Sequence, residues 1–270
     1  MDIYSDQPKE DRAVRERYTK NNNNNNNNEN NPVMAPTDLS RAIAAEEWAR
    51  AHELATRQPR QANAWSKRTG FFEGRTVASV LPIHEAAVGG APLEVMQALV
   101  TAYPEGLTAV ESSYQRLPLH CACRKNAIPA VIRLLCDAQP EACLAADSLG
   151  RLPLHYALSN GADPEVISIL MSCRPDAARG LDQRGWTPLH VASSMGAAVP
   201  VVRSILDAYP EAVLIKTRKG STIAKTIPKL CPHRPVLQQM LADATKKVER
   251  AVRLPPMKSK RIAYDEMVYV

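Results

Sequence analysis

Aromatic residues are scarce in this sequence, whose 270 residues include two phenylalanines, three tryptophans and eight tyrosines. A hydrophobic core must therefore be built mainly from Leu, Ile, Val and Ala, and hydrophobic residues reach an ordinary 45% of the chain. No apolar run approaches the roughly 18 residues that a membrane-spanning helix needs. These features favour a soluble protein without a membrane span.

The chain also lacks a secretory signal and a cysteine framework. Residues 1–6 are polar and acidic and contain no apolar h-region. The six cysteines are scattered without the spacing of a disulfide scaffold, which favours a reducing compartment. We therefore expect an intracellular protein in the cytoplasm. The basic clusters Lys246–Lys247 and Lys258–Arg261 have the spacing of a bipartite nuclear-import signal, so a nuclear location is the alternative.

Signatures of catalysis are absent from the sequence. It has no Gly-x-Ser-x-Gly elbow, no His-Glu-x-x-His, no phosphate-binding loop and no dinucleotide fingerprint. We predict that the protein is not an enzyme and uses no cofactor, and an enzyme fragment is the weakest of the alternatives.

One tetrapeptide recurs four times, with proline in its second place and histidine in its fourth. The histidines lie 36, 35 and 35 residues apart, and a second marker, a proline followed by an acidic residue, keeps the same spacings. Because two independent markers share one period, the chain is a tandem repeat. The tetrapeptides are Leu81–His84, Leu117–His120, Leu152–His155 and Thr187–His190, and the second prolines are Pro104, Pro140, Pro175 and Pro210.

Each period has the features of a helix pair. A proline opens the first helix, where its missing N–H costs nothing, and Gly161 and Gly196 mark the turn to the second helix. The second helix shows apolar residues at a spacing near 3.6, as in residues 166–170. It ends before the next proline, because the residue preceding a proline avoids the α region. Segments 147–150 and 182–185 predict turns between units.

The pattern Gly-x-Thr-Pro-Leu-His at residues 185–190 resembles the ankyrin repeat, and the resemblance covers about residues 79–218. The sequence departs from the common form in three ways. Leucine replaces the capping threonine at residues 81, 117 and 152, and Ser79 and Gln115 replace glycine. An extra turn also surrounds the proline of the second marker in each unit. The resemblance implies an all-α helix-turn-helix solenoid of about six units, including two degenerate caps. Such a fold is expected to bind another protein.

Three regions are predicted. Residues 1–36, with an asparagine run at 21–28, form a disordered arm, because a polar tract cannot bury enough apolar surface to fold; Asn-rich self-association is a weaker alternative. Residues 37–250 form the repeat domain, with a first cap at 37–62 and a charged last helix from Pro235 to about Arg250. Residues 251–270 form a tail, whose end Val268–Val270 could add to a PDZ-type groove. About nine extra residues between Pro59 and His84 contain Trp65, Phe71 and Phe72.

The four repeated histidines invite a metal or catalytic interpretation. Their recurrence once per unit argues for a structural role, and the resemblance implies that each ring hydrogen-bonds neighbouring backbone. Residues 120–123, His-Cys-Ala-Cys, are the most metal-like cluster. Cys136, Cys143 and Cys173, however, align one period away with Ala, Val, Leu or Met, so cysteine occupies small apolar positions. We therefore predict no metal site.

The resemblance further implies that the hairpin tips and the ends of the first helices line one concave, partner-binding face. Seven residues there are basic and none is acidic, and the net charge is +6, so we expect a protein partner with an acidic surface. The candidates are Tyr114, Arg116, Arg124, Lys125, Ser148, Leu149, Arg151, Ser159, Asn160, Gln183, Arg184, Trp186, Ser194, Met195, Arg218, Lys219 and Ser221.

Among these residues, Trp186 is predicted to be an exposed hot spot flanked by Arg151 and Arg184, because its counterparts in other units are not aromatic. Packing of its ring over the neighbouring hairpin is the alternative. A solvated charged rim is the alternative for the face as a whole. Nucleic-acid binding through the same surface is less favoured, since aromatic stacking platforms are absent. We expect a monomer.

Overall fold

A computed structural model describes residues 35–71 and 77–253. Most of the predicted arm 1–36 and of the tail 251–270 lies outside these ranges. Three features of the sequence analysis also lie outside the described residues: Phe72, the basic cluster Lys258–Arg261 and the end Val268–Val270.

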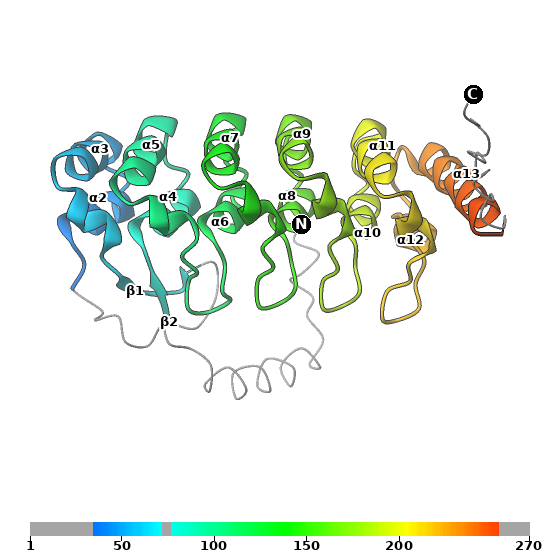
Figure 1. Ribbon diagram of the computed structural model, residues 1–270, viewed down its shortest axis with the longest axis horizontal. Helices are drawn as coiled ribbons and strands as arrows, with labels where there is room; N and C mark the ends of the chain where they lie inside the picture. Colours follow the sequence, from blue (N-terminus) through cyan, green and yellow to red (C-terminus); the bar gives the residue numbers. More distant parts are fainter. Residues whose placement is uncertain (1–34, 72–76, 254–270) are drawn as a thin grey trace, which may run out of the picture.

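The described chain consists of short antiparallel helix pairs stacked side by side (Figure 1), which confirms the helical repeat fold. The first helices form one row, the second helices form another, and the hairpins between units extend from the same edge of the array (Figure 1). The pairs are α2 (Asp38–Ala44) with α3 (Trp48–Arg57), α4 (Pro82–Gly89) with α5 (Leu93–Ala102), α6 (Pro118–Arg124) with α7 (Pro129–Ala138), α8 (Pro153–Ser159) with α9 (Pro164–Cys173), α10 (Pro188–Ser194) with α11 (Val199–Ala208), and α12 (Ile223–Thr226) with α13 (Arg234–Arg253).

A one-turn 3-10 helix follows each of the second helices α3, α5, α7, α9 and α11. Each begins at a proline, and the residue before it leaves the helical region, as Gln139 does with φ −146°. These turns account for the extra residues that lengthen each unit. They are η1 (Pro59–Asn63), η3 (Pro104–Leu107), η4 (Pro140–Leu144), η5 (Pro175–Arg179) and η6 (Pro210–Leu214).

The core runs along the array between the two rows of helices. The third residue of each tetrapeptide is buried, and the alanine three residues after it is fully buried. The third residues are Ile83, Leu119, Leu154 and Leu189, and the alanines are Ala86, Ala122, Ala157 and Ala192. Because alanine is small, neighbouring first helices can approach closely at this position. Leu237, Leu241 and Val248 on one face of α13 close the end of the core, and this helix extends three residues beyond the predicted Arg250.

One feature differs from the purely helical expectation. Strands β1 (Ser66–Thr69) and β2 (Val77–Val80) pair antiparallel, with Ser66 opposite Val80. The predicted insertion therefore lengthens the first hairpin into a short two-stranded sheet. Ala78 and Val80 are buried and Val77 is exposed, an alternation typical of a strand.

One turn position lacks the glycine that other units have, whereas Ser79, the other predicted replacement of glycine, lies in strand β2. Gly150, Gly185 and Gly220 adopt φ near +73°, and Gln115 occupies the equivalent position with φ 56°. A side chain is disfavoured in this left-handed region, so Gln115 is held there by the contacts of its hairpin. No helix of the described residues is both long and apolar enough to cross a membrane.

Candidate functional site

The repeated histidines connect each first helix to the hairpin that follows it. In His155, Nδ1 accepts a hydrogen bond from the Leu152 N–H at 3.1 Å, which leaves Nε2 protonated to donate to the Trp186 carbonyl at 3.1 Å. His120 bonds in the same way to Leu117 and Arg151, each at 3.1 Å. These contacts confirm the predicted structural role, and they also explain why leucine can replace the capping threonine.

The other two histidines follow the same plan with local differences. His84 accepts from the Leu81 N–H at 3.3 Å and lies 3.1 Å from the Ala109 carbonyl. His190 contacts the Thr187 hydroxyl at 2.9 Å, whereas its Nε2 makes no hydrogen bond. Burial lowers the pKa of all four rings to about 4, so they are neutral near pH 7.

A buried carboxylate closes the base of each central hairpin. The Asp147 side chain accepts from the Leu149 and Arg151 N–H groups, each at 2.8 Å, and from the Tyr156 hydroxyl at 2.6 Å. Asp182 repeats this arrangement with the N–H groups of residues 184 and 186, each at 2.8 Å. Burial raises the pKa of Asp182. These acidic residues were not among the predicted site residues, although their 35-residue spacing could have identified them.

The hairpin after residue 110 contains a buried ion pair. Arg116 Nε lies 2.8 Å from Glu111 Oε1, and the two side chains are 3% and 0% exposed. The Glu111 carboxylate also accepts from the Ser113 and Tyr114 N–H groups at 2.7 and 3.0 Å. Burial alone raises the pKa of Glu111, but the Arg116 charge and the Ser113 donors hold it below its ordinary value.

Successive hairpins are joined to one another by backbone hydrogen bonds. The Ser148 N–H donates to the Tyr114 carbonyl at 2.8 Å, and the N–H groups of residues 183 and 218 donate to the carbonyls of residues 149 and 184 at 3.0 and 2.9 Å. These bonds fix the spacing of the hairpin tips along the array (Figure 1). The tips therefore form a pre-organised row.

Three predicted contact residues, Arg116, Arg151 and Ser159, are buried, which corrects the expectation that they are exposed. Arg116 is 2% exposed and Arg151 is 9% exposed. The Arg116 guanidinium pairs with Glu111 and lies over the Tyr114 ring at 4.4 Å, and that of Arg151 lies 5.8 Å from the Tyr156 ring. Both arginines stand at the base of a hairpin, where their charge is used within the fold.

The other predicted contact residues lie at or near the surface. Lys125, Arg218 and Lys219 are exposed, and the remainder are half-buried. Asn160 has a local role as well, because its side chain donates to the Tyr156 carbonyl at 2.7 Å. The half-buried residues are Tyr114, Arg124, Ser148, Leu149, Asn160, Gln183, Arg184, Trp186, Ser194, Met195 and Ser221.

Trp186 is not the fully exposed residue that was expected. It is half-buried, packs against the hydrophobic core, and lies with its ring centroid 6.0 Å from that of His190. Its backbone N–H and carbonyl bind Asp182 and His155. This arrangement agrees with the alternative of local packing, and it leaves part of the ring at the surface.

The two edges of the array differ in charge. We define the hairpin face as residues 112–115, 148–150, 183–185 and 218–220 with the first-helix ends 124–126, 159–161 and 194–196. Arg124, Lys125, Arg184, Arg218 and Lys219 lie on this face, and no acidic residue does. The second helices and 3-10 turns carry both signs on exposed residues, among them Arg133, Asp137, Glu141, Glu165, Asp176, Arg179, Arg203, Asp207 and Glu211.

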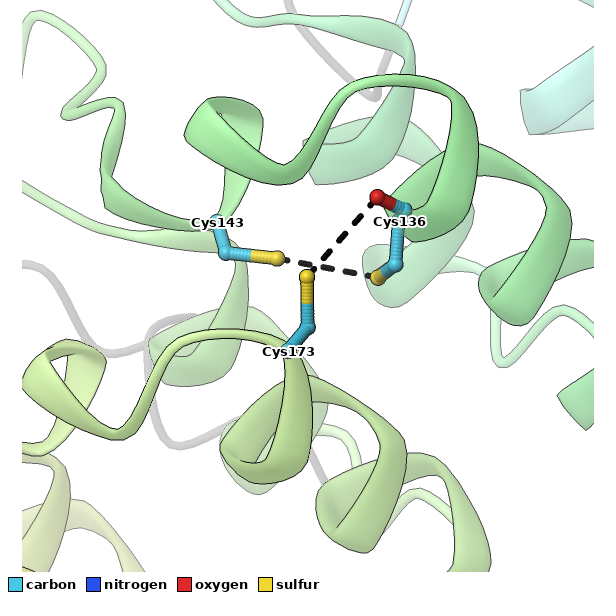
Figure 2. A group of neighbouring side chains, drawn as sticks. All are labelled: Cys136, Cys143 and Cys173. Carbon is cyan, nitrogen blue, oxygen red and sulfur yellow. Dashed lines mark hydrogen bonds between the residues drawn. The ribbon is translucent and has the colours of Figure 1, made fainter.

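Three cysteines converge between two neighbouring units (Figure 2). Cys136 on α7 and Cys143 on η4 are buried, and Cys173 at the end of α9 is half-buried. A hydrogen bond with Cys136, together with burial, raises the pKa of Cys143 far above its ordinary range. Burial raises the pKa of Cys173 to about 11. The Cys143 and Cys173 thiols are therefore not activated nucleophiles. Sequence analysis had assigned these residues to separate apolar positions and missed their convergence.

Residues 141–216 match the family model described as ankyrin repeats in three copies. The match covers η4 to η6 and the hairpins and helix pairs between them. No curated protein matches the chain.

Proposed function

We propose that this chain, an ankyrin-repeat protein, binds a partner protein with an acidic surface through its hairpin face. Ankyrin repeats are generally protein–protein interaction modules. The observation that carries the proposal is the separation of charge: five basic residues and no acidic residue lie on the hairpin face, whereas the opposite edge carries both signs. A surface of one sign attracts an oppositely charged partner and speeds the encounter.

The hydrogen bonds between hairpins support the same proposal. Because the tips are linked at 2.8–3.0 Å, the basic side chains are held on a fixed backbone. Binding would then cost little backbone ordering, and that cost otherwise reduces affinity. Arg116 and Arg151 position the hairpins in this proposal and make no contact with the partner.

The proposed contact residues are thus the surface members of the predicted set. Lys125, Arg218 and Lys219 supply charge at exposed positions. The half-buried residues Tyr114, Arg124, Asn160, Arg184 and Met195 supply further polar and apolar contacts on this face, and the half-buried Trp186 adds to them at its border.

A pair of matched charge reversals tests this proposal. One variant combines Lys125→Glu, Arg218→Glu and Lys219→Glu on the hairpin face. The control combines Arg133→Glu, Arg179→Glu and Arg203→Glu, all exposed on the opposite edge, and it changes the net charge by the same amount. Proteins captured from a cell lysate are quantified by mass spectrometry for both variants and the wild type. The proposal expects acidic proteins to be lost with the first variant and retained with the control.

Other outcomes of this experiment would reject the hairpin face or identify a different class of partner. Equal capture by both variants, or equal loss, would reject the hairpin face as the binding surface. If the captured material disappears after nuclease treatment, the partner is a nucleic acid, and its affinity should then fall steeply with salt. Thermal unfolding of both variants near the wild-type temperature shows that the fold is intact, as expected for exposed positions.

A further inference from the structure

The thiol groups of Cys136, Cys143 and Cys173 form a cluster that packing alone does not require. Their sulfur atoms all lie within 4.8 Å of one another, and the Cys136 and Cys143 sulfurs are 3.6 Å apart (Figure 2). The Cys173 thiol points into the same space and donates to the Cys136 carbonyl at 3.7 Å. One period away, the position of Cys143 holds Ala178. The core accepts a small apolar residue at this position, so the thiols are available for another role.

The geometry of the cluster fits a three-coordinate ion. Bonds from sulfur to a thiophilic ion are about 2.3 Å, as for zinc, so three bound sulfurs lie about 4 Å apart around a planar ion and about 3.5 Å apart around a pyramidal one. The Cys136 and Cys143 sulfurs are 3.6 Å apart, and all three sulfurs lie within 4.8 Å of one another. Cys173 is half-buried, which leaves a route of entry from solvent. Among the described residues, no histidine, aspartate or glutamate joins the group as a fourth ligand.

Because the site is buried, the net charge of the ion with its three thiolates determines which thiophilic ion it favours. Cys136 and Cys143 are almost fully buried in the core, where an uncompensated charge is costly. Three thiolates around Zn(II) leave one negative charge and require a fourth ligand, and around Cu(I) they leave two negative charges. Around a trivalent ion such as As(III) the complex is neutral. It needs no further ligand.

We propose that Cys136, Cys143 and Cys173 form a trithiol site that binds a trivalent thiophilic ion of the As(III) class. Arsenous acid reacts with the three thiols: three As–O bonds break and three As–S bonds form. The thiol protons leave with the hydroxyl groups as three water molecules, and no electrons are transferred. Because Cys136 and Cys143 belong to one unit and Cys173 to the next, the bound ion joins the two units in the middle of the array (Figure 2).

Arsenite binding to the full chain, reduced with a phosphine and freed of competing thiols, tests the proposal. Native mass spectrometry is expected to show one arsenic atom per chain. Calorimetry gives the affinity, and the melting temperature is expected to rise with arsenite concentration, since the ion binds the folded state. Zn(II) and Cu(I) are titrated in parallel and are expected to bind more weakly than As(III).

Two variants follow substitutions that other units already contain. Cys143→Ala matches Ala178, and Cys173→Ala matches Ala138 and Ala208, so both variants are expected to fold. Each should lower the As(III) affinity by more than an order of magnitude. Cys231→Ala, which removes a buried cysteine outside the cluster, should leave the affinity unchanged.

Three results would overturn the proposal. The first is the absence of arsenite binding to the reduced wild type. The second is an unchanged affinity in Cys173→Ala, which would reduce the site to two thiols. The third is tighter binding of Zn(II) or Cu(I) than of As(III), which would contradict selection by charge.

Discussion

The base and the tip of the hairpins use charge in opposite ways. At the base of the hairpin after residue 110, Glu111 and Arg116 are buried and bonded to each other. At the tip of the last hairpin, Arg218 and Lys219 are exposed. A basic side chain at the base therefore holds the fold, whereas one at the tip is available to a partner. Five predictions test this division, in order of decreasing effect.

Breaking the buried ion pair should have the largest effect on stability. Arg116→Ala leaves the Glu111 carboxylate buried without its cation, and we expect a loss of about 3–5 kcal/mol in the free energy of unfolding. Urea denaturation followed by circular dichroism measures this loss. Lys219→Ala at an exposed tip is the control and should change stability by less than about 0.5 kcal/mol. Equal effects of the two substitutions would contradict the division between base and tip.

Removing one of the central histidines should be the next most costly change. His155→Ala leaves the Leu152 N–H and the Trp186 carbonyl without their buried partner, and we expect a loss of about 1–3 kcal/mol. Chemical denaturation gives the value. His52→Ala, at an exposed position on α3, is the control. A wild-type stability together with lost partner binding would instead assign His155 to the binding surface.

The lowered pKa of the buried histidines predicts how the stability of the fold depends on pH. Their pKa is about 4 in the folded chain against an ordinary value of 6.5. Between these values the unfolded chain binds more protons, so the stabilisation is complete above about pH 6.5 and is lost as the pH falls toward 4. Melting temperatures at constant ionic strength should therefore fall across this window. The melting temperature of the His155→Ala variant should fall less steeply with decreasing pH than that of the wild type.

Trp186 lies between the base and the tip, and a smaller effect is expected there. Because its half-buried ring packs against the core, Trp186→Ala should lower stability by about 1 kcal/mol. A thermal melt detects this loss. If stability is unchanged and partner binding is weakened, the ring belongs to the contact surface alone.

The smallest effect concerns the turn at Gln115, and it should be a gain. Gln115→Gly places glycine at φ 56°, as in the other hairpins, and removal of the left-handed strain should stabilise the fold by about 0.5 kcal/mol. The matched change Asn126→Gly, at φ 51°, should gain nothing, because asparagine tolerates this region and its side chain bonds the Asn160 carbonyl at 3.0 Å. Precise denaturation midpoints distinguish the two variants.

The helical parts of the fold could be predicted because they depend on local signals. Proline at the first helical turn and before each 3-10 helix restricts the backbone whatever its neighbours are. The strands β1 and β2 could not be predicted as readily, since pairing of Ser66 with Val80 joins residues on either side of an insertion. Strand pairing depends on a partner that no short window contains.

The candidate site was predicted less completely than the fold. The repeat period assigned Arg116 and Arg151 to the hairpins correctly, but it did not indicate which way their side chains point. For Arg116, Glu111 lies five residues earlier and supplies the buried negative charge that makes an inward direction favourable. The acidic residue is visible in the sequence, but it identifies a buried ion pair only once the hairpin brings its two sides together.

For this protein, the sequence by itself determined the repeat, its period of about 35 residues and the structural role of the histidines. Each of these follows from residue types that impose the same local geometry in every unit. The tertiary structure alone decided which charges are buried, how far Trp186 is covered and that three cysteines from two units meet. Burial and proximity depend on how units stack. A stacking contact joins residues that lie 30 or more positions apart, as Cys173 and Cys143 do.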